Sequence, residues 1–476
     1  MRVIFVHGWS VTNTDTYGGL PAALQQQIIT GAKLQLDHLD LAKYVSFSDE
    51  VKVDDLARGM QQALEDLFGH QLRATDEFSC ITHSTGGPVV RTWIDLFYGR
   101  KLASCPLRHL VMLAPANHGS ALATLGKGKL CRLKSFVADG VQPGTGVLDW
   151  LELGSDQGWR LNEAWLGYDC VKTGLYPFVL AGQRIDRALY DNLNAYTDEA
   201  GSDGVVRVAA ANLNYRLLYL EQTGTTLAMT RFVSGRPTAF GVLPGRSHSG
   251  EKIGIMRSVH ADDTPATHPT LEWVVKCLQV TSRAKYDEVA AALAKVTDKT
   301  QEDEKTEEVK AGFLFKRTFT TNRYCMLVFR IVDDRDNELD DYDLLFTAGP
   351  TYDPNHLPPG FFVDRQRNAL NRRKLTYYLN HDVMAAWFAK PEVADKFGLK
   401  VVARPADGYA HYVVAEHRST FTELKGLFAP NQTLMIEIRL KRHVRTGVYR
   451  VAPFNGGLPK EDFSKQSKGD DIREGL

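Results

Sequence analysis

The chain has 476 residues, a formal net charge of zero at pH 7, 43% hydrophobic residues and 24% charged residues. This length predicts two domains, and the composition is typical of a soluble globular protein. The zero net charge argues against nucleic acid as a partner and against attraction of the whole molecule to anionic membranes. Six cysteines are scattered without C-x-x-C spacing, so neither a zinc site nor a disulfide framework is indicated.

No targeting segment or membrane span is visible in the sequence. The first residues lack the basic segment, apolar stretch and cleavage site of a signal peptide. No run approaches the ~18 apolar residues of a membrane helix. We therefore expect a chain made in the cytoplasm, and any export would use a route without a cleaved leader.

The chain opens with an apolar strand and a glycine turn. Residues 2–6 read R-V-I-F-V, which is typical of a strand buried on both faces of a parallel sheet. His7, Gly8 and Trp9 follow at once, and Gly8 permits a tight turn that would aim the next amide inward. An isolated His-Gly turn is common, so this segment indicates a function only in combination with a second motif.

That second motif is a serine on a predicted strand–turn–helix. An apolar run at 78–81 leads into T-H-S-T-G at 82–86, and apolar residues at helical spacing follow from 89 to 97. Such an elbow presents a serine hydroxyl on a strained turn, and small neighbours let the helix approach the strand. Ser84 is therefore the candidate nucleophile. Position 82 departs from the G-x-S-x-G pattern because it holds threonine, and an ordinary buried turn is the alternative.

A long insertion follows the strand predicted at 110–114. His118 lies just after that strand, and we expect it to be structural. Residues 120–174 are longer than a simple connection and contain helical stretches such as 146–153. They are consistent with a cap that shields a site from water, or with a surface excursion of packed helices.

The candidate acid lies beyond this insertion. Asp203 stands in S-D-G-V-V, after a strand predicted at 175–182. An Asp-Gly pair is also an ordinary turn signal, so a structural turn is the alternative.

The candidate base is a histidine near the end of the same region. His248 follows a strand and turn at 240–245 and lies among small residues that leave room for an imidazole to reach a serine. His260 and His268 compete, but one lies beside an Asp-Asp-Thr-Pro stretch and the other directly before a proline.

These segments resemble the lipase branch of the α/β-hydrolases. The order Ser84, Asp203, His248 is the order of the catalytic triad in that superfamily. Residues 115–120 read P-A-N-H-G-S and are similar to the t-P-h-x-G-s stretch of bacterial lipases, and residues 202–206 are similar to their D-G-x-V segment. The resemblance implies an α/β fold with a mostly parallel sheet and a cap insertion.

The same resemblance implies an oxyanion hole and an activity. The backbone N–H groups of Trp9 and Thr85 would bind the oxyanion. We expect a serine ester hydrolase that acts on lipid acyl esters, as a lipase or a phospholipase A, without a metal or other cofactor. Its partners would be a lipid or phospholipid substrate and, transiently, a membrane. An acyltransferase with the same triad, or a non-catalytic binding protein on a hydrolase core, are the alternatives.

The composition changes after a polar stretch at 297–308. We expect a hydrolase domain at 1–280 with its cap at 120–174, a helix and polar linker at 281–311, a β-sandwich-like accessory domain at 312–454, and a disordered tail at 455–476. The strands of the second domain are short and alternate apolar with polar residues, for example at 434–440.

The role of this second domain stays open among membrane docking, partner binding and delivery. Its acidic run at 333–338, with Asp340, Asp341 and Asp343, resembles a calcium-ligand cluster but lacks the glycine and final glutamate of an EF-hand. An acidic surface loop is the alternative. A leaderless lipase-like hydrolase with an extra β-rich domain also resembles the phospholipase effectors that bacteria deliver through type VI secretion.

Overall fold

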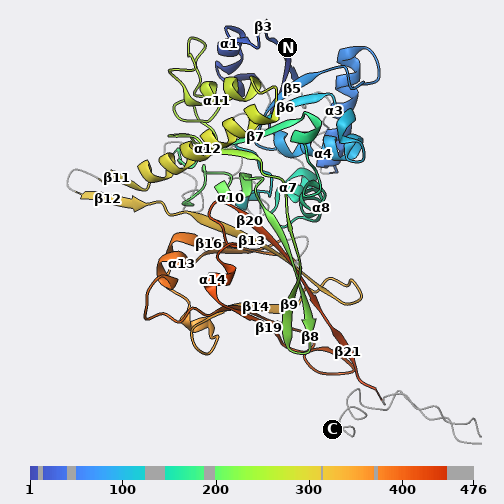
Figure 1. The fold of residues 1–476 in the computed structure, drawn as a ribbon, viewed down its shortest axis with the longest axis vertical. Coiled ribbons are helices and arrows are strands. Elements are labelled where there is room, and N and C mark those ends of the chain that lie inside the picture. Colours follow the sequence, from blue (N-terminus) through green and yellow to red (C-terminus); the bar gives the residue numbers. More distant parts are fainter. Residues whose placement is uncertain are drawn as a thin grey trace, which may run out of the picture.

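The structure is a computed structural model that describes residues 1–8, 14–39, 50–123, 145–186, 199–311, 315–368 and 374–446, with the backbone alone between 307 and 319. Trp9, the middle of the predicted cap and the predicted tail lie outside the described residues. The chain forms two stacked parts, a helix-covered sheet and a β-rich sheet below it (Figure 1). Within the described ranges, no helix has both the length and the apolar character that crossing a bilayer requires.

The first part is built on a six-stranded sheet in the order β10-β7-β6-β5-β1-β4, in which every neighbouring pair is parallel. Its strands are β1 (Arg2–Val6), β4 (Gln35–Leu39), β5 (Phe78–His83), β6 (Leu107–Leu113), β7 (Tyr176–Ala181) and β10 (Ala239–Val242). Since all six run the same way, their carboxyl ends lie at one edge of the sheet, which we call the carboxyl edge. This edge faces the second part (Figure 1).

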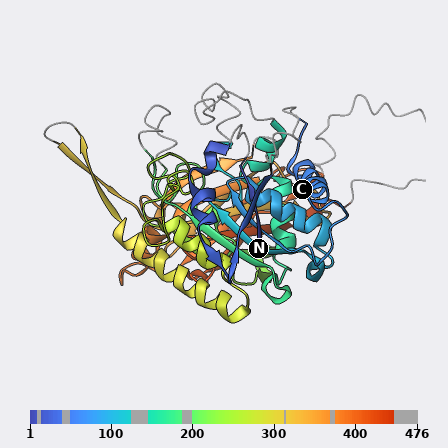
Figure 2. The same cartoon turned by 90° about the horizontal axis from the view of Figure 1, so that it is seen from above.

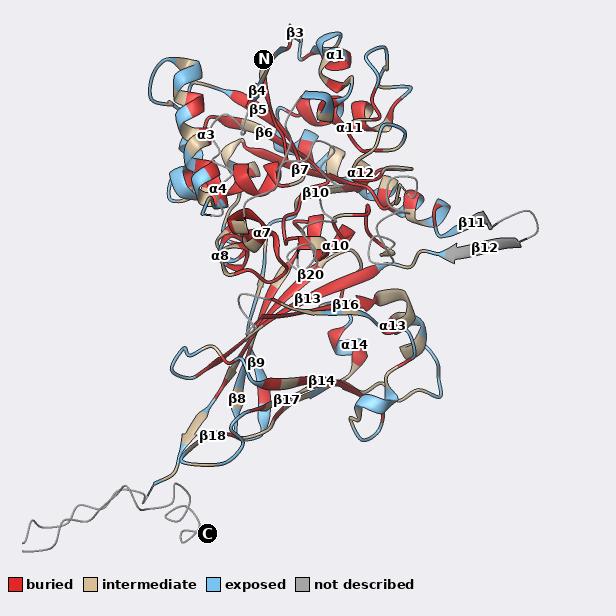
Figure 3. Cartoon of the chain, turned by 180° about the vertical axis from the view of Figure 1, so that it is seen from behind, coloured by how far each residue is buried: buried red, intermediate tan, exposed pale blue. Residues whose placement is uncertain are grey.

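Helices cover both faces of this sheet, which is why its inner strands are almost entirely buried, whereas the edge strand β4 is partly exposed. Ile4 and Val6 pack into one hydrophobic cluster with α3 (Val53–Phe68) and α4 (Gly86–Tyr98). Val3 and Phe5 point the other way, into a cluster with α1 (Leu20–Gln25), α11 (Pro269–Leu278) and α12 (Arg283–Asp303). Buried strands between partly exposed helices are visible in Figure 3. The predicted α/β architecture is confirmed.

The predicted cap is helical where the structure describes it. α7 (Thr145–Leu151) and α8 (Asp156–Trp165) lie at the carboxyl edge, together with the short α10 (Val208–Ala211), between the parallel sheet and the second part (Figure 1). Ser155 begins α8, because its Oγ accepts a hydrogen bond from the Gly158 amide at 3.2 Å.

The second part is one nine-stranded sheet, the C-terminal sheet, in the order β14-β17-β19-β9-β8-β20-β13-β16-β15. Its strands are β8 (Arg216–Thr223), β9 (Thr226–Ser234), β13 (Tyr324–Asp333), β14 (Tyr342–Ala348), β15 (Phe362–Arg367), β16 (Lys374–Asn380), β17 (Phe397–Ala403), β19 (Ala415–Ser419) and β20 (Thr433–Leu440). The hairpin β8–β9 precedes α11 in the chain, yet β8 pairs in parallel with β20. The sheet therefore includes strands from both halves of the sequence.

This sheet curls so that strands far apart in its order face each other. The ring of Phe346 on β14 lies 5.1 Å from that of Tyr377 on β16, and the Tyr377 hydroxyl donates to the Leu344 carbonyl at 3.0 Å. A separate hydrophobic cluster fills the space between them. The result is the β-rich second part that the sequence predicted, made by one sheet folded over its own core.

Short elements complete the fold. They are η1 (Thr14–Tyr17), β2 (Ile28–Ile29), β3 (Ala32–Lys33), η2 (Leu102–Ser104), η3 (Val171–Thr173), β11 (Thr306–Ala311), β12 (Phe315–Thr320), η4 (Pro354–His356), α13 (His381–Phe388), β18 (Ala410–Tyr412), α14 (Phe421–Leu424) and β21 (Arg442–Val444). The hairpin β11–β12 projects away from the body of the molecule (Figure 2).

The polar segment predicted as a linker has regular structure. α12 continues to Asp303, and β11 begins at Thr306. Two polar residues of this stretch are buried and have partners: Thr297 accepts a hydrogen bond from the Val242 amide at 3.0 Å, and Glu304 accepts one from the Gly245 amide at 2.6 Å. These contacts join the end of α12 to the end of β10, and the absence of an apolar period gave no indication of them.

A buried polar network joins α4 to α8. The guanidinium of Arg91 donates to Asn117 Oδ1 at 3.2 Å and to Asn162 Oδ1 at 2.8 Å, and it lies over the ring of Trp165. Asn162 in turn donates to Nδ1 of His118 at 3.1 Å. Burial, with the nearby Arg91, lowers the pKa of His118 to about 3. His118 thus has a place in the packing between the sheet and the cap.

We expect His118 to make stability depend on pH. The folded protein keeps this ring neutral down to about pH 3, whereas the unfolded chain binds a proton near pH 6.5. The free energy of unfolding should therefore fall as the pH drops from about 6.5, by up to about 1.4 kcal/mol per pH unit for this residue. Thermal unfolding of wild type and His118→Gln between pH 7 and 5 tests this, since glutamine keeps an acceptor for Asn162. Parallel pH dependences of the two proteins would contradict it.

Candidate active site

Ser84 lies on a strained turn between β5 and α4. Its φ angle is 53°, in the left-handed region that non-glycine residues rarely adopt. A Cβ on Gly86 would lie 2.5 Å from the Val6 carbonyl oxygen, and one on Gly8 would lie 3.0 Å from the Ser84 Cβ. The small residues of the motif are therefore required by close approach of the backbones, as the sequence predicted.

Thr82, the departure from the usual motif, is accommodated within β5. Its side chain is fully buried, and its hydroxyl has no hydrogen-bond partner among the residues that the structure describes. The threonine therefore fits the elbow sterically, without a polar contact in this part of the chain.

The structure brings the three predicted side chains together at the carboxyl edge. Nε2 of His248 lies 3.1 Å from Oγ of Ser84, and Nδ1 of His248 lies 2.9 Å from Oδ2 of Asp203. Ser84 follows β5, Asp203 lies in the loop before α10, and His248 lies in the loop after β10. Residues separated by 164 and 45 positions thus form one hydrogen-bonded chain.

Asp203 is oriented by its own loop. Its Oδ1 accepts from the amides of Val205 and Val206 at 3.0 and 2.7 Å, which leaves Oδ2 to accept from the imidazole. The Asp203 carbonyl also accepts from the His248 amide at 2.9 Å. This arrangement places the proton on Nδ1, so that Nε2 is free to accept the proton of a hydroxyl.

A second histidine supports the base. His83 precedes the nucleophile, and its Nε2 lies 3.0 Å from the His248 carbonyl oxygen, with the two rings 4.8 Å apart. Burial, together with the neighbouring His248, lowers the pKa of His83 to about 3. A neutral His83 can therefore donate from Nε2 and help to orient the His248 loop. The sequence alone did not predict a role for His83, although its position directly before Ser84 could have indicated one.

One of the two predicted oxyanion donors can be placed. Thr85 is buried and lies directly before the first residue of α4. The backbone N–H groups at the start of a helix have no acceptor within the helix. The Thr85 amide therefore remains available for an oxyanion beside Ser84. Trp9 lies outside the described residues, so its role stays a prediction.

Of the two competing histidines, one has other partners and the other is exposed. Nε2 of His268 lies 3.0 Å from both Ser258 Oγ and a guanidinium nitrogen of Arg246, and its Nδ1 accepts from the Thr270 amide at the start of α11. His260 is exposed. Of the three candidate bases, His248 is the one that the structure joins to Ser84.

The acidic run of the C-terminal sheet makes contacts within itself and with β20. Asp333 accepts from the Arg335 and Asn337 amides at 2.9 Å, and Asp336 pairs with Arg439. Among the residues described here, no cluster of three or more His, Cys, Asp or Glu side chains is placed to bind a metal ion. Calcium binding at this run stays a prediction.

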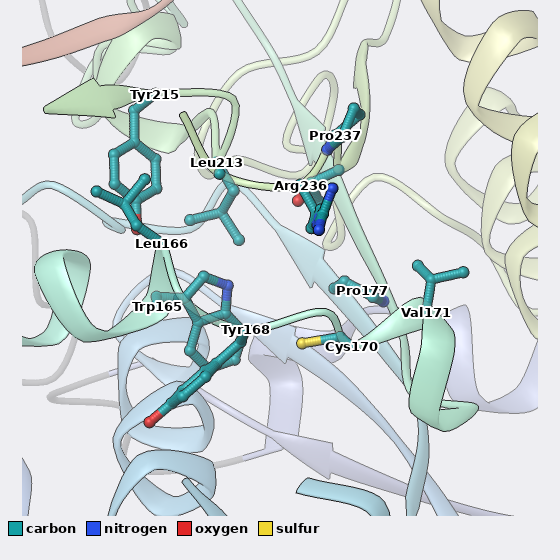
Figure 4. Close-up of a pocket in the computed structure, with 12 residues that line it drawn as sticks. Trp165, Leu166, Tyr168, Cys170, Val171, Pro177, Leu213, Tyr215, Arg236 and Pro237 are labelled. Atoms are coloured by element: carbon teal, nitrogen blue, oxygen red, sulfur yellow. The ribbon is translucent and has the colours of Figure 1, made fainter. Parts of the chain in front are cut away.

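The structure also contains a hollow, shown with its lining residues in Figure 4. Its lining includes Pro177 at the start of β7 and Pro237 just before β10, together with Trp165 and Tyr215. The two prolines lie at strand beginnings, whereas Trp165 is the last residue of α8. The hollow is distinct from the site at Ser84 because Ser84, Asp203 and His248 are not among its lining residues.

The hydrogen-bonded chain can perform proton transfer and nucleophilic attack. His248 can take the proton of Ser84, and the Asp203 carboxylate can stabilise the imidazolium that results. With the Thr85 amide beside the nucleophile, the arrangement is equipped for acyl transfer.

Comparison with known proteins places the chain in a family. No protein-family model matches the sequence, and no curated protein matches it. Among solved structures, phospholipase PlaB from Legionella pneumophila in complex with thio-NAD is 48% identical, with a TM-score of 0.87 over 97% of this chain and 98% of that chain. A second structure of phospholipase PlaB is 49% identical, with a TM-score of 0.89 over 97% of each chain. The chain therefore belongs to the family of the Legionella pneumophila phospholipase PlaB.

Proposed function

We propose that this protein is a serine phospholipase that hydrolyses acyl ester bonds of phospholipids through Ser84, His248 and Asp203. As a member of the PlaB family it is a carboxylic ester hydrolase. The observation that supports the mechanism is the chain of contacts at 3.1 and 2.9 Å that joins the serine, the imidazole and the carboxylate.

Acylation begins when His248 takes the proton of the Ser84 hydroxyl. Oγ forms a bond to the ester carbonyl carbon, and the carbonyl oxygen becomes an oxyanion that the Thr85 amide binds. When this intermediate collapses, the ester C–O bond breaks, and the imidazolium gives its proton to the departing alcohol. The acyl group remains on Ser84, and the lysophospholipid leaves.

Deacylation repeats these steps with water. His248 removes a proton from a water molecule, whose oxygen attacks the acyl carbon, and the released Ser84 oxygen recovers that proton. An alcohol acceptor in place of water would make the same site an acyltransferase. The two outcomes differ only in which molecule reaches the acyl-enzyme.

Other expectations rest on the sequence resemblance and stay predictions. They are transient membrane contact, a protein partner for the C-terminal sheet, and export as a type VI secretion effector.

Ser84→Ala should abolish ester hydrolysis, by about 10³-fold or more, while the protein stays folded, because no other group supplies the attacking oxygen. A fluorophosphonate should form an adduct with wild type at Ser84, and mass spectrometry of the labelled peptide locates it. An adduct elsewhere, or turnover near wild type in Ser84→Ala, would refute the nucleophile assignment. A protein that neither turns over esters nor reacts would instead be a binding protein on a hydrolase core.

Asp203→Asn should lower kcat by about 10³- to 10⁴-fold with little change in KM, because an amide at this position favours the wrong tautomer of His248. Steady-state kinetics with a soluble ester measures this. Asp263→Asn is the matched control, since Asp263 accepts from the amide of the competing His260 at 2.8 Å. Equal losses in the two variants would show that Asp203 has no special role.

Phospholipids should be better substrates than neutral lipids, because the chain is 48% identical to a phospholipase over almost its whole length. Fatty-acid release from phosphatidylcholine or phosphatidylglycerol vesicles should exceed release from triacylglycerol emulsions by about tenfold or more at equal ester concentration. The reverse order would make the protein a neutral lipase and leave the triad chemistry intact.

A further inference from the structure

The segment that carries Asp203, residues 199–207, is in direct contact with the C-terminal sheet; we call it the acid loop. Tyr378 on β16 is fully buried, and its hydroxyl donates to the carbonyl of Gly201 at 3.1 Å and to that of Ala200 at 3.3 Å. Burial raises the pKa of Tyr378 well above its ordinary value, so the hydroxyl remains a donor. Tyr378, which lies 177 positions after Gly201 in the chain, thus binds the backbone two residues before Asp203.

The acid loop also packs closely against two rings. Tyr324 and Tyr378 stack with their centroids 4.9 Å apart. A Cβ on Gly201 would lie 2.3 Å from a ring carbon of Tyr324 and 2.6 Å from the Tyr378 oxygen, and its φ angle is 75°. Glycine is therefore required here both by the backbone angle and by contact with the C-terminal sheet.

Arg207 joins the two ends of the acid loop. Its guanidinium donates to both carboxylate oxygens of Glu199, at 2.9 and 2.6 Å, and also to Asp364 on β15. It lies 4.2 Å from the centroid of the Tyr378 ring. Burial alone would lower the pKa of Arg207, but Glu199 and Asp364 raise it, so the group stays charged in a site where its side chain is 1% exposed.

These contacts determine where Asp203 can lie. The loop is fixed on the N-terminal side of Asp203 through Ala200 and Gly201, and on its C-terminal side through Arg207. The carboxylate is oriented by amides of the same loop, so any displacement of the loop would move Oδ2 away from His248. A shift of about 1 Å at a catalytic group can cost on the order of 10²-fold in rate.

We propose that Tyr378 and Asp364 are positioning residues, which hold the acid loop so that the Asp203 carboxylate stays within hydrogen-bond distance of His248. The C-terminal sheet is then a structural component of the active site. This inference rests on the proposed function and extends it to residues that contact neither substrate nor base.

The experiment compares two neighbouring tyrosines of β16. Tyr378→Phe removes the hydroxyl that binds the acid loop. Tyr377→Phe is the matched control, since Tyr377 is also buried and its hydroxyl also donates to a backbone carbonyl, that of Leu344 inside the C-terminal sheet. Thermal unfolding, kcat and KM for a soluble ester, and the rate of Ser84 labelling by a fluorophosphonate are measured for both variants in the full-length chain.

Tyr378→Phe should lower kcat by about tenfold with KM within about twofold of wild type, whereas Tyr377→Phe should keep wild-type kcat even if both lose similar thermal stability. In an Asp203→Asn background, Tyr378→Phe should have less than a twofold further effect, because there is no longer a carboxylate to position. A general structural role would instead lower the rate by the same factor in both backgrounds. Equal kcat losses in the two tyrosine variants, or wild-type kcat in Tyr378→Phe, would overturn the proposal.

Asp364→Asn provides a second variant, because its side chain is partly exposed and its loss leaves the Arg207–Glu199 pair in place. It should lower kcat several-fold with KM unchanged, and an unaltered kcat would count against the proposal even if Tyr378→Phe does not fold. Ester hydrolysis and Ser84 labelling of the wild-type protein test the proposed function separately. If wild type hydrolyses the ester and is labelled at Ser84, a normal Tyr378→Phe variant refutes the positioning role alone; if wild type does neither, the proposed function itself fails.

Discussion

The close approach of two backbones at the carboxyl edge of the parallel sheet is the constraint on which the site depends. Gly86 lies so near the Val6 carbonyl that a Cβ there would be 2.5 Å from its oxygen. This approach lets α4 begin directly after β5 and confines Ser84 to its positive φ angle. The hydroxyl consequently projects from the edge towards His248, and the loops that carry the other two side chains are arranged around it.

The interface between the two parts of the molecule also positions part of the site. Hydrogen bonds cross it from Tyr378 to the acid loop, from Thr433 to the Ala209 carbonyl at 2.9 Å, and from Asn212 to the Asn431 carbonyl at 2.7 Å. All of them reach the segment around α10, next to Asp203. The C-terminal sheet therefore contacts the segment that positions Asp203, whereas Ser84 is positioned by the parallel sheet itself.

Local sequence signals were sufficient for five of the six strands of the parallel sheet, for the elbow and for the order of the three candidate residues, whereas the polar strand β4 was not identified. Apolar runs identified buried strands, and glycines at close approaches identified the turn at Ser84. Contacts between distant residues left no such signal. The pairing of β8 with β20 and the contact of Tyr378 with Gly201 could not be read from either segment alone. The polar end of α12 was interpreted as a linker because it has no apolar face, although Thr297 and Glu304 accept hydrogen bonds from the Val242 and Gly245 amides.

The placement of β20 has a consequence for how the protein is made. This strand, residues 433–440, is the last long strand of the described chain, yet it lies between β8 and β13 in the middle of the C-terminal sheet. During synthesis, β8 and β13 leave the ribosome well before the strand that separates them in the finished sheet. The sheet can close only after residues 433–440 have emerged, so β8 and β13 lack their shared neighbour until that point of synthesis.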